Sequence, residues 1–182
     1  KTKDHEFGVV FCSDLKRAHS SAKLTWEGVY PIISDARLRE CNYGKLNGAS
    51  SDIVEPMQEE ECIKKPFPDG ESYEDVKKRI SEFLNEVYEK YKGKRIAIVA
   101  HKAPQLALDV ILNGKTWEQA FSDDWRNKKA WQPGWEYTLT QKVEISEPIS
   151  EKKSIFSKLK ESFKKKEPVI EELKPEVQKE EP

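Results

Sequence analysis

An arginine, a histidine and a glutamate are the residues of this sequence that could do chemistry together. Arg17 and His101 each follow a short apolar stretch, and Lys102 comes directly after His101. A phosphate dianion is bound well by a guanidinium fork, by a histidine donor and by the backbone amides of a helix N-terminus. Glu40, in the segment 37–44, could add a general acid. These residue types predict a site for a small phosphorylated molecule.

Each of these residues also has an ordinary structural explanation when it is considered alone. An arginine after a strand is more often a surface or ion-pair residue, and a histidine at a strand end is more often structural. Glu40 would be a solvated surface residue in most chains. The prediction therefore depends on the fold, because ligands of open α/β sheets bind beyond the carboxyl ends of the strands.

The helices and strands that the sequence predicts would bring these residues to one edge of a sheet. Short apolar runs predict strands at residues 7–12, 31–33, 96–100 and 135–139. Helical patterns lie at residues 15–23, 53–62, 72–91 and 104–112. Ser13 and Asp14 are expected to cap the first of these helices. The order of elements predicts an α/β fold, a three-layer α/β/α sandwich around a mostly parallel sheet.

The clearest element is the helix that begins after Ser72. Ser72 and Asp75 have the spacing of a capping box, and apolar residues from Val76 to Tyr91 recur at helical spacing. Gly93 is expected to end the helix. The pattern predicts one long amphipathic helix.

Composition excludes several classes of function. The 182 residues carry a formal net charge of −1, which offers no electrostatic case for binding nucleic acid. No apolar stretch approaches the ~20 residues of a membrane span, and the first residues do not resemble a signal peptide. The three cysteines, Cys12, Cys41 and Cys62, show no CxxC pair. We therefore expect neither a disulfide framework nor a zinc site, and a cytoplasmic location.

The composition changes near residue 142. Residues 143–182 hold nine Lys and ten Glu but no Trp or Tyr. Such a segment cannot bury enough apolar area to offset its ordering entropy. We expect a folded domain at 1–142 and a mostly disordered tail at 143–182. A basic amphipathic helix is predicted at 151–166, which could contact an anionic membrane surface or a protein partner.

Four segments in this order resemble the histidine phosphatase (phosphoglycerate mutase-like) superfamily. They are residues 12–18, residues 37–48, residues 68–72 with Arg79, and residues 98–101. The resemblance covers residues 7–112 and implies a phosphatase that works through a phosphohistidine, with neither metal nor cofactor. It implies that Arg17 and His101 bind the phosphoryl group of a small phosphorylated substrate and that Glu40 protonates the leaving oxygen.

The sequence departs from the family pattern in two places. It contains no Arg-His-Gly motif, which carries the nucleophilic histidine in that family. We expect this motif, with the first strand, in a missing N-terminal segment, so that the domain is incomplete and this chain alone is inactive. Lys102 stands where the family usually has glycine, and it would either add a cation beside the phosphate or point to solvent.

Two other functions stay open. An inactive module that binds a phosphorylated ligand or a protein partner is one alternative to a phosphatase. A phosphoglycerate mutase-type phosphotransferase is the other, although the short connection between Gly48 and Glu71 favours hydrolysis.

Overall fold

The computed structural model describes residues 6–127 and 132–145. The chain divides into two units, residues 1–148 and residues 149–182, and every described residue belongs to the first. The helix predicted at 151–166 lies outside the described residues, and the domain boundary predicted after residue 142 stays a prediction. Within the described part, none of the helices combines the length and the apolar character that a membrane span needs.

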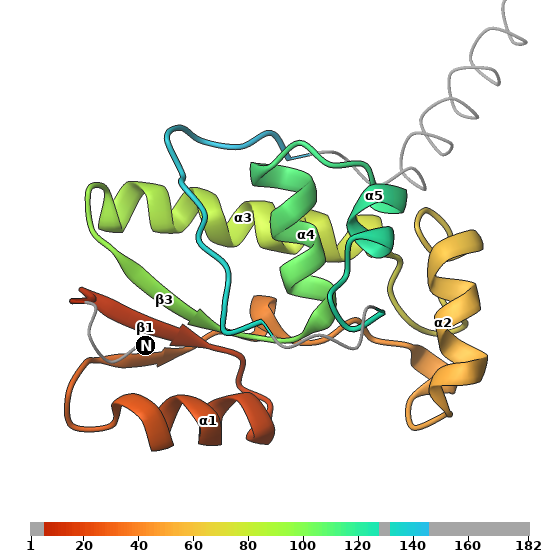
Figure 1. Cartoon of the computed structure of the whole chain (residues 1–182), viewed down its shortest axis with the longest axis horizontal. Coiled ribbons are helices and arrows are strands. Elements are labelled where there is room, and N and C mark those ends of the chain that lie inside the picture. Colours follow the sequence, from red (N-terminus) through yellow and green to blue (C-terminus); the bar gives the residue numbers. More distant parts are fainter. Residues whose placement is uncertain (1–5, 128–131, 146–182) are drawn as a thin grey trace, which may run out of the picture. The chain divides into compact units, whose positions relative to one another are not determined.

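The sheet of the described region has three parallel strands, in the order β2-β1-β3 (Figure 1). The strands are β1 (Val9–Cys12), β2 (Ile32–Ser34) and β3 (Ile96–Val99). Val10 in the central strand is paired with Ile32 on one side and with Ala97 on the other. The strands predicted at 7–12, 31–33 and 96–100 are therefore confirmed, and so is their parallel arrangement.

Helices cover both faces of this sheet (Figure 1). The helical elements are α1 (Lys16–Trp26), η2 (Ala36–Leu38), η3 (Gly44–Leu46), α2 (Ser51–Glu60), α3 (Tyr73–Tyr91), α4 (Lys102–Leu112) and α5 (Trp117–Ser122). Val10 and Cys12 of β1 belong to a small core with residues of α1, whereas Val9 and Phe11 belong to the larger core with α3 and α4. The predicted α/β/α layers are confirmed.

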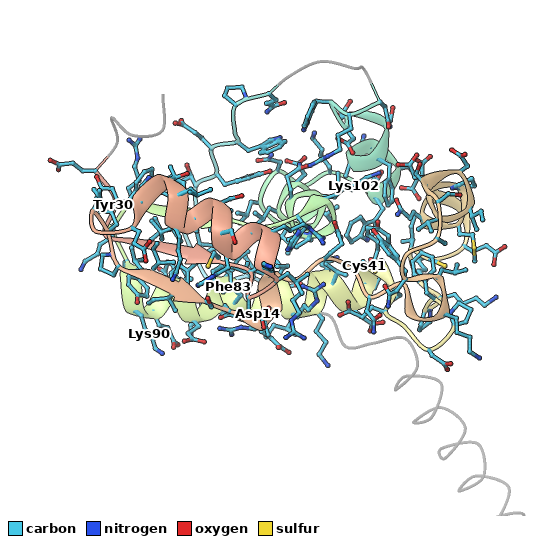
Figure 2. All side chains as sticks on the ribbon, turned by 90° about the horizontal axis from the view of Figure 1, so that it is seen from below. Asp14, Tyr30, Cys41, Phe83, Lys90 and Lys102 are labelled. Atoms are coloured by element: carbon cyan, nitrogen blue, oxygen red, sulfur yellow. The ribbon has the colours of Figure 1, made fainter. Side chains whose placement is uncertain are left out.

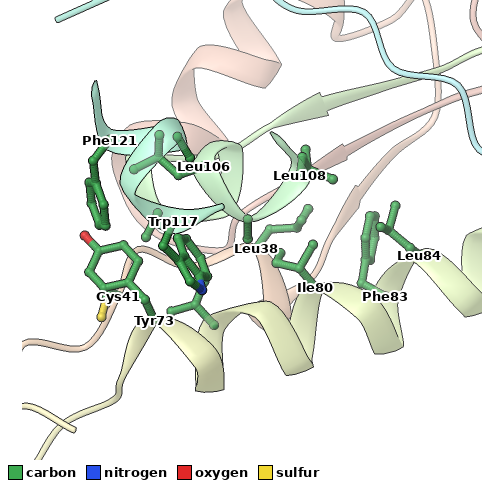
Figure 3. Packing of buried hydrophobic residues seen from close by; sticks show 14 of the residues in the cluster. Leu38, Cys41, Tyr73, Ile80, Phe83, Leu84, Leu106, Leu108, Trp117 and Phe121 are labelled. Carbon is green, nitrogen blue, oxygen red and sulfur yellow. The ribbon is translucent and has the colours of Figure 1, made fainter. Parts of the chain in front are cut away.

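The apolar face of α3 packs into the larger core, together with residues of α4 and α5 (Figure 3). Ile80 and Phe83 are fully buried, and the ring of Phe83 contacts Phe11 of β1 edge-on at 5.2 Å between centroids. At the other end of α3, Tyr73 packs against Trp117 and other residues of α5. Burial of these aromatic rings fixes α3 and α5 relative to the sheet.

The two predicted helix caps have different outcomes. Ser72 and Asp75 form the expected capping box at the start of α3, and Gly93 adopts a positive φ of 74° just after the helix. The capping role predicted for Ser13 and Asp14 is wrong. Ser13 Oγ accepts a hydrogen bond from the backbone of Leu15 before α1 begins, and Leu15 occupies the cap position without a side-chain bond to the helix.

The strand predicted at 135–139 is also wrong. Alternate residues of this segment are partly buried, and Tyr137 and Leu139 pack against the larger core. The hydroxyl of Tyr137 donates a hydrogen bond to Asp109 at 3.0 Å, and the side chain of Asn85 bonds both backbone polar groups of Val143. The alternation is real, but within the described residues side chains rather than a neighbouring strand hold this segment.

We predict that Ser72→Ala lowers the free energy of unfolding by about 1 kcal/mol, because the mutation removes the hydrogen bond that Ser72 Oγ accepts from the backbone of Asp75 and the one that it donates to Oδ2 of Asp75. Urea denaturation followed by circular dichroism measures this difference. Ser50→Ala is the matched control, since Ser50 is the cap residue before α2 and makes no side-chain bond to that helix. Equal losses in the two variants would contradict the role given to the capping box.

Candidate functional site

A cleft of about 690 Å³ lies at the end of the sheet where β1 leads into α1. Its walls come from the start of α1, from the segment between Ala36 and Gly48, from Glu71 before α3 and from Arg79 on α3. Among the charged groups that line it are Arg17 and Glu40. The carboxyl ends of parallel strands are the expected place for a ligand in this class of fold.

Arg17 and His101 are in direct contact although 84 positions separate them. The Nε of Arg17 donates a hydrogen bond to Nδ1 of His101 at 3.0 Å. Because Nδ1 accepts this bond, the proton of the neutral ring is on Nε2. Nε2 is buried and has no hydrogen-bond partner among the described residues. His101 therefore carries an N–H that no described residue satisfies.

Burial and charge together keep His101 neutral. Its pKa lies below the ordinary 6.5, first because the ring is partly buried and second because of the positive charge of Arg17. The carboxylates of Glu40 and Asp14 oppose this shift without reversing it. At neutral pH the ring is thus uncharged and can accept from Arg17 on one side while it donates on the other.

Glu40 binds the N-terminus of α4. Its Oε1 accepts hydrogen bonds from the backbone of Ala103 at 2.9 Å and of Cys41 at 3.0 Å, and its Oε2 accepts from the backbone of Lys102 at 3.1 Å. The amides of Lys102 and Ala103 are those that the sequence assigns to a phosphate, and that part of the prediction is wrong because both donate to Glu40 instead. A carboxylate of the protein already occupies this helix terminus, which favours negative charge.

Arg79 holds the segment that carries Glu40. Its guanidinium group donates to the carbonyl oxygens of Arg37 and Glu40 and to the carboxylate of Glu71 at 2.9 Å. Glu71 in turn accepts from the backbone of Asn42 at 2.8 Å. The sequence connects Arg79 with the site only through a family resemblance, because no spacing rule links a helix residue to carbonyl groups 39 and 42 positions away.

An ion pair between Arg39 and Asp14 at the cleft was not expected from the sequence. Arg39 binds Asp14 through two hydrogen bonds, of 2.8 Å from Nε and 2.6 Å from Nη2. The bond from Arg39 lowers the pKa of Asp14. Arg39 and Arg79 are thus each neutralised by a carboxylate, whereas the terminal nitrogens of Arg17 have no hydrogen-bond partner in the described part of the chain.

Lys102 does not extend its side chain toward Arg17. Its ammonium group lies 3.7 Å from the carboxylate of Asp124 and 3.8 Å from that of Glu55. In Figure 2 it lies toward α5, away from Asp14. The phosphate-binding role expected for Lys102 stays a prediction, and these two ion pairs weigh against it.

The loop around Gly44 and the loop around Gly70 lie beside the cleft and contact each other through their backbones. Lys45 donates its backbone N–H to the carbonyl oxygen of Pro68 at 2.9 Å. A Cβ atom on Gly44 would clash with the same oxygen, and one on Gly70 would clash with the carbonyl oxygen of Asn42. Glycine is required at both positions because only a hydrogen atom fits there.

The structure brings together the three residues that the sequence predicts for one site, Arg17, Glu40 and His101. The three predicted residues converge: Arg17 and Glu40 line one cleft, and both residues contact the start of α4 or the residue before it. Among the described residues, no cluster of three or more His, Cys, Asp and Glu is placed to hold a metal ion.

Comparison with known proteins identifies the family. Residues 1–129 match the family model of the histidine phosphatase superfamily (branch 1). A 2,3-bisphosphoglycerate-dependent phosphoglycerate mutase of Methylobacterium sp. (strain 4-46) is 30% identical over 131 residues, which are 65% of this chain and 63% of that protein. An uncharacterised phosphatase, PhoE of Bacillus subtilis (strain 168), is 30% identical over 116 residues, or 62% of this chain and 56% of that protein.

A solved structure has the same fold. Bacillus stearothermophilus YhfR superimposes with a TM-score of 0.58 at 21% identity, over 79% of this chain and 74% of that one. The chain spans less than two thirds of the length of the two curated relatives named above.

We predict that the chain loses stability as the pH falls below 6.5, because the unfolded state then binds a proton at residue 101 that the folded state resists. The contribution of the neutral His101 ring to the free energy of unfolding is fully present above pH 6.5. It is lost as the pH falls toward the lower pKa that His101 has in the folded chain. Urea denaturation between pH 7.5 and 5.5 measures this loss. His101→Gln should show a shallower decline, and an equally steep one would contradict the lowered pKa.

We predict that Arg79→Met lowers the free energy of unfolding by about 3 kcal/mol, because Glu71 and two carbonyl groups lose their donor. Lys90→Met is the matched control on the same helix, since it removes an exposed ion pair with Glu86 that should contribute less than about 1 kcal/mol. Similar losses for the two variants in urea denaturation would show that Arg79 does not hold the segment.

Proposed function

Because the chain belongs to the histidine phosphatase superfamily, we propose that it is part of a phosphatase that hydrolyses a small phosphomonoester through a phosphohistidine. The observation that carries this proposal is the contact between Arg17 and His101. It combines a guanidinium group whose terminal nitrogens have no partner among the described residues with a neutral imidazole whose N–H has none there either. Both groups suit a phosphoryl oxygen.

Each site residue has a proposed task. Arg17 binds and neutralises the phosphoryl group, and His101 donates a hydrogen bond from Nε2 to one of its oxygens. Glu40 protonates the leaving oxygen of the alcohol.

The nucleophilic histidine is proposed to precede the given sequence and to lie on a strand beside β3. The residues of β3, Ile96–Val99, are all apolar, which is typical of a strand buried on both faces. Yet only Ala97 is buried, and within the described region β3 pairs with β1 alone. A strand on its other edge would cover the remaining residues and would end beside His101.

Hydrolysis without a metal ion in the cytoplasm completes the proposal. Arg17 supplies positive charge that other phosphatases take from a metal, and the three cysteines are buried and unpaired, which suits a reducing compartment. A phosphotransferase remains a candidate because one relative is a phosphoglycerate mutase. An inactive phosphate-binding module remains the other.

We predict that the chain as given binds inorganic phosphate but hydrolyses para-nitrophenyl phosphate negligibly. Produced together with the residues that its gene encodes upstream, it should hydrolyse that ester in the presence of EDTA. In this longer protein, Arg17→Ala or His101→Ala should each cost about 10²-fold in kcat, the scale for one preorganised donor. Lys45→Ala, which removes an exposed ion pair with Asp69, should leave kcat unchanged.

Four results would count against this proposal. Loss of activity with EDTA would contradict the metal-free mechanism, and unchanged kcat in His101→Ala would remove its role. A longer protein that binds phosphate without hydrolysing it, or a gene that encodes no upstream histidine strand, would favour the binding module.

A further inference from the structure

Lys102 belongs to two networks at once. Its backbone N–H donates to Oε2 of Glu40 at 3.1 Å, on the cleft side of α4. Its side chain reaches residues of two other elements, with Nζ 3.7 Å from Asp124 after α5 and 3.8 Å from Glu55 on α2. One residue therefore joins the carboxylate of the candidate site to two elements outside it.

The pair between Lys102 and Asp124 is shielded from water. The Lys102 side chain is 16% exposed and that of Asp124 is 0% exposed, whereas the Glu55 side chain is 54% exposed. A buried carboxylate requires a compensating charge. Asp124 thus has two cationic partners, Arg126 at 2.8 Å and Lys102 at 3.7 Å, and the exposed Glu55 contributes less to the position of Lys102.

The two oxygens of Asp124 have different surroundings. Oδ1 accepts hydrogen bonds from the backbone and from Nη1 of Arg126, at 3.1 and 2.8 Å. Oδ2 is buried without a hydrogen bond among the described residues, and it is the atom that faces Lys102. Arg126 also donates to Gln105 one turn further along α4, at 3.3 Å. The segment after α5 therefore contacts α4 at Lys102 and again at Gln105.

We propose that Lys102 is a positioning residue, whose buried ion pair with Asp124 holds the first turn of α4 where it orients Glu40 and His101. The backbone of Lys102 and Ala103 carries two of the three amides that bind Glu40, and His101 is the residue just before α4. A displacement of this turn moves both groups. The inference rests on the proposed function of Glu40 and His101, but it assigns Lys102 to the scaffold and not to the phosphate.

The test compares the full chain with Lys102→Met, Asp124→Asn and the double variant. The primary measurement is the pH titration of the His101 ring by NMR. The charged groups that act on this ring are Arg17, Arg79, Glu40 and Asp14, and none of the variants removes them. A change in the titration therefore reports a change in geometry. Binding of inorganic phosphate is measured in parallel.

We expect each single variant to move the His101 midpoint upward, toward 6.5, because the contact with Arg17 and the burial of the ring are both weakened. Phosphate affinity should fall less than tenfold. In the double-mutant cycle, the equilibrium constants for unfolding should show that residues 102 and 124 are coupled by about tenfold. Lys102→Arg, which keeps the charge, should leave the His101 midpoint where it is in the unaltered chain. Lys45→Met, which removes an exposed ion pair with Asp69, should change neither the His101 midpoint nor the affinity for phosphate.

Two outcomes would overturn the inference. An unchanged His101 titration in both single variants would remove the positioning role. A loss of phosphate affinity above tenfold in Lys102→Met, independent of Asp124, would place Lys102 on the anion instead. Failure of the unaltered chain to bind phosphate would count against the proposed function alone, because the titration and the coupling still decide the role of Lys102. If a single variant does not fold, the double variant, which removes both charges, supplies the titration.

Discussion

The carboxylate of Glu40 at the N-terminus of α4 is the interaction on which the site depends. Three backbone amides meet it, from Cys41, Lys102 and Ala103. Hydrogen bonds to an ionised acceptor are stronger than neutral ones, and the positive end of a helix dipole adds to them. The contact joins a loop to a helix more than sixty residues later, and His101 lies directly at the junction. Arg79 holds the loop side of this contact, and Lys102 holds the helix side.

The charges of the cleft are arranged to favour one anionic group. Two of its three guanidinium groups are paired with carboxylates, Arg39 with Asp14 and Arg79 with Glu71. These pairs shape the walls and contribute little net charge. Arg17 differs because its Nε contacts a neutral imidazole. Among the three guanidinium groups that line the cleft, Arg17 is therefore the one whose charge no carboxylate of the described residues offsets.

The sequence predicts those parts of the fold that depend on local patterns. Apolar runs identify β1, β2 and β3, and the Ser72–Asp75 spacing identifies the start of α3. The convergence of Arg17 and His101 also follows, because both come after parallel strands. The bond of Glu40 to α4 does not follow, since it depends on how a loop packs against a distant helix. The segment 135–139 has the alternation of a strand, but alternation reports which side chains are buried and not whether a neighbour pairs with the backbone.

The contact between Gly44 and Gly70 limits how this cleft could be remodelled. Backbone of one loop touches backbone of the other with room for nothing larger than hydrogen, so the two loops act as one piece. A chimera that takes residues 42–48 from a relative would have to take residues 66–71 with them. Loop grafting, which usually treats surface segments as independent modules, would here need to transfer two segments of sequence together.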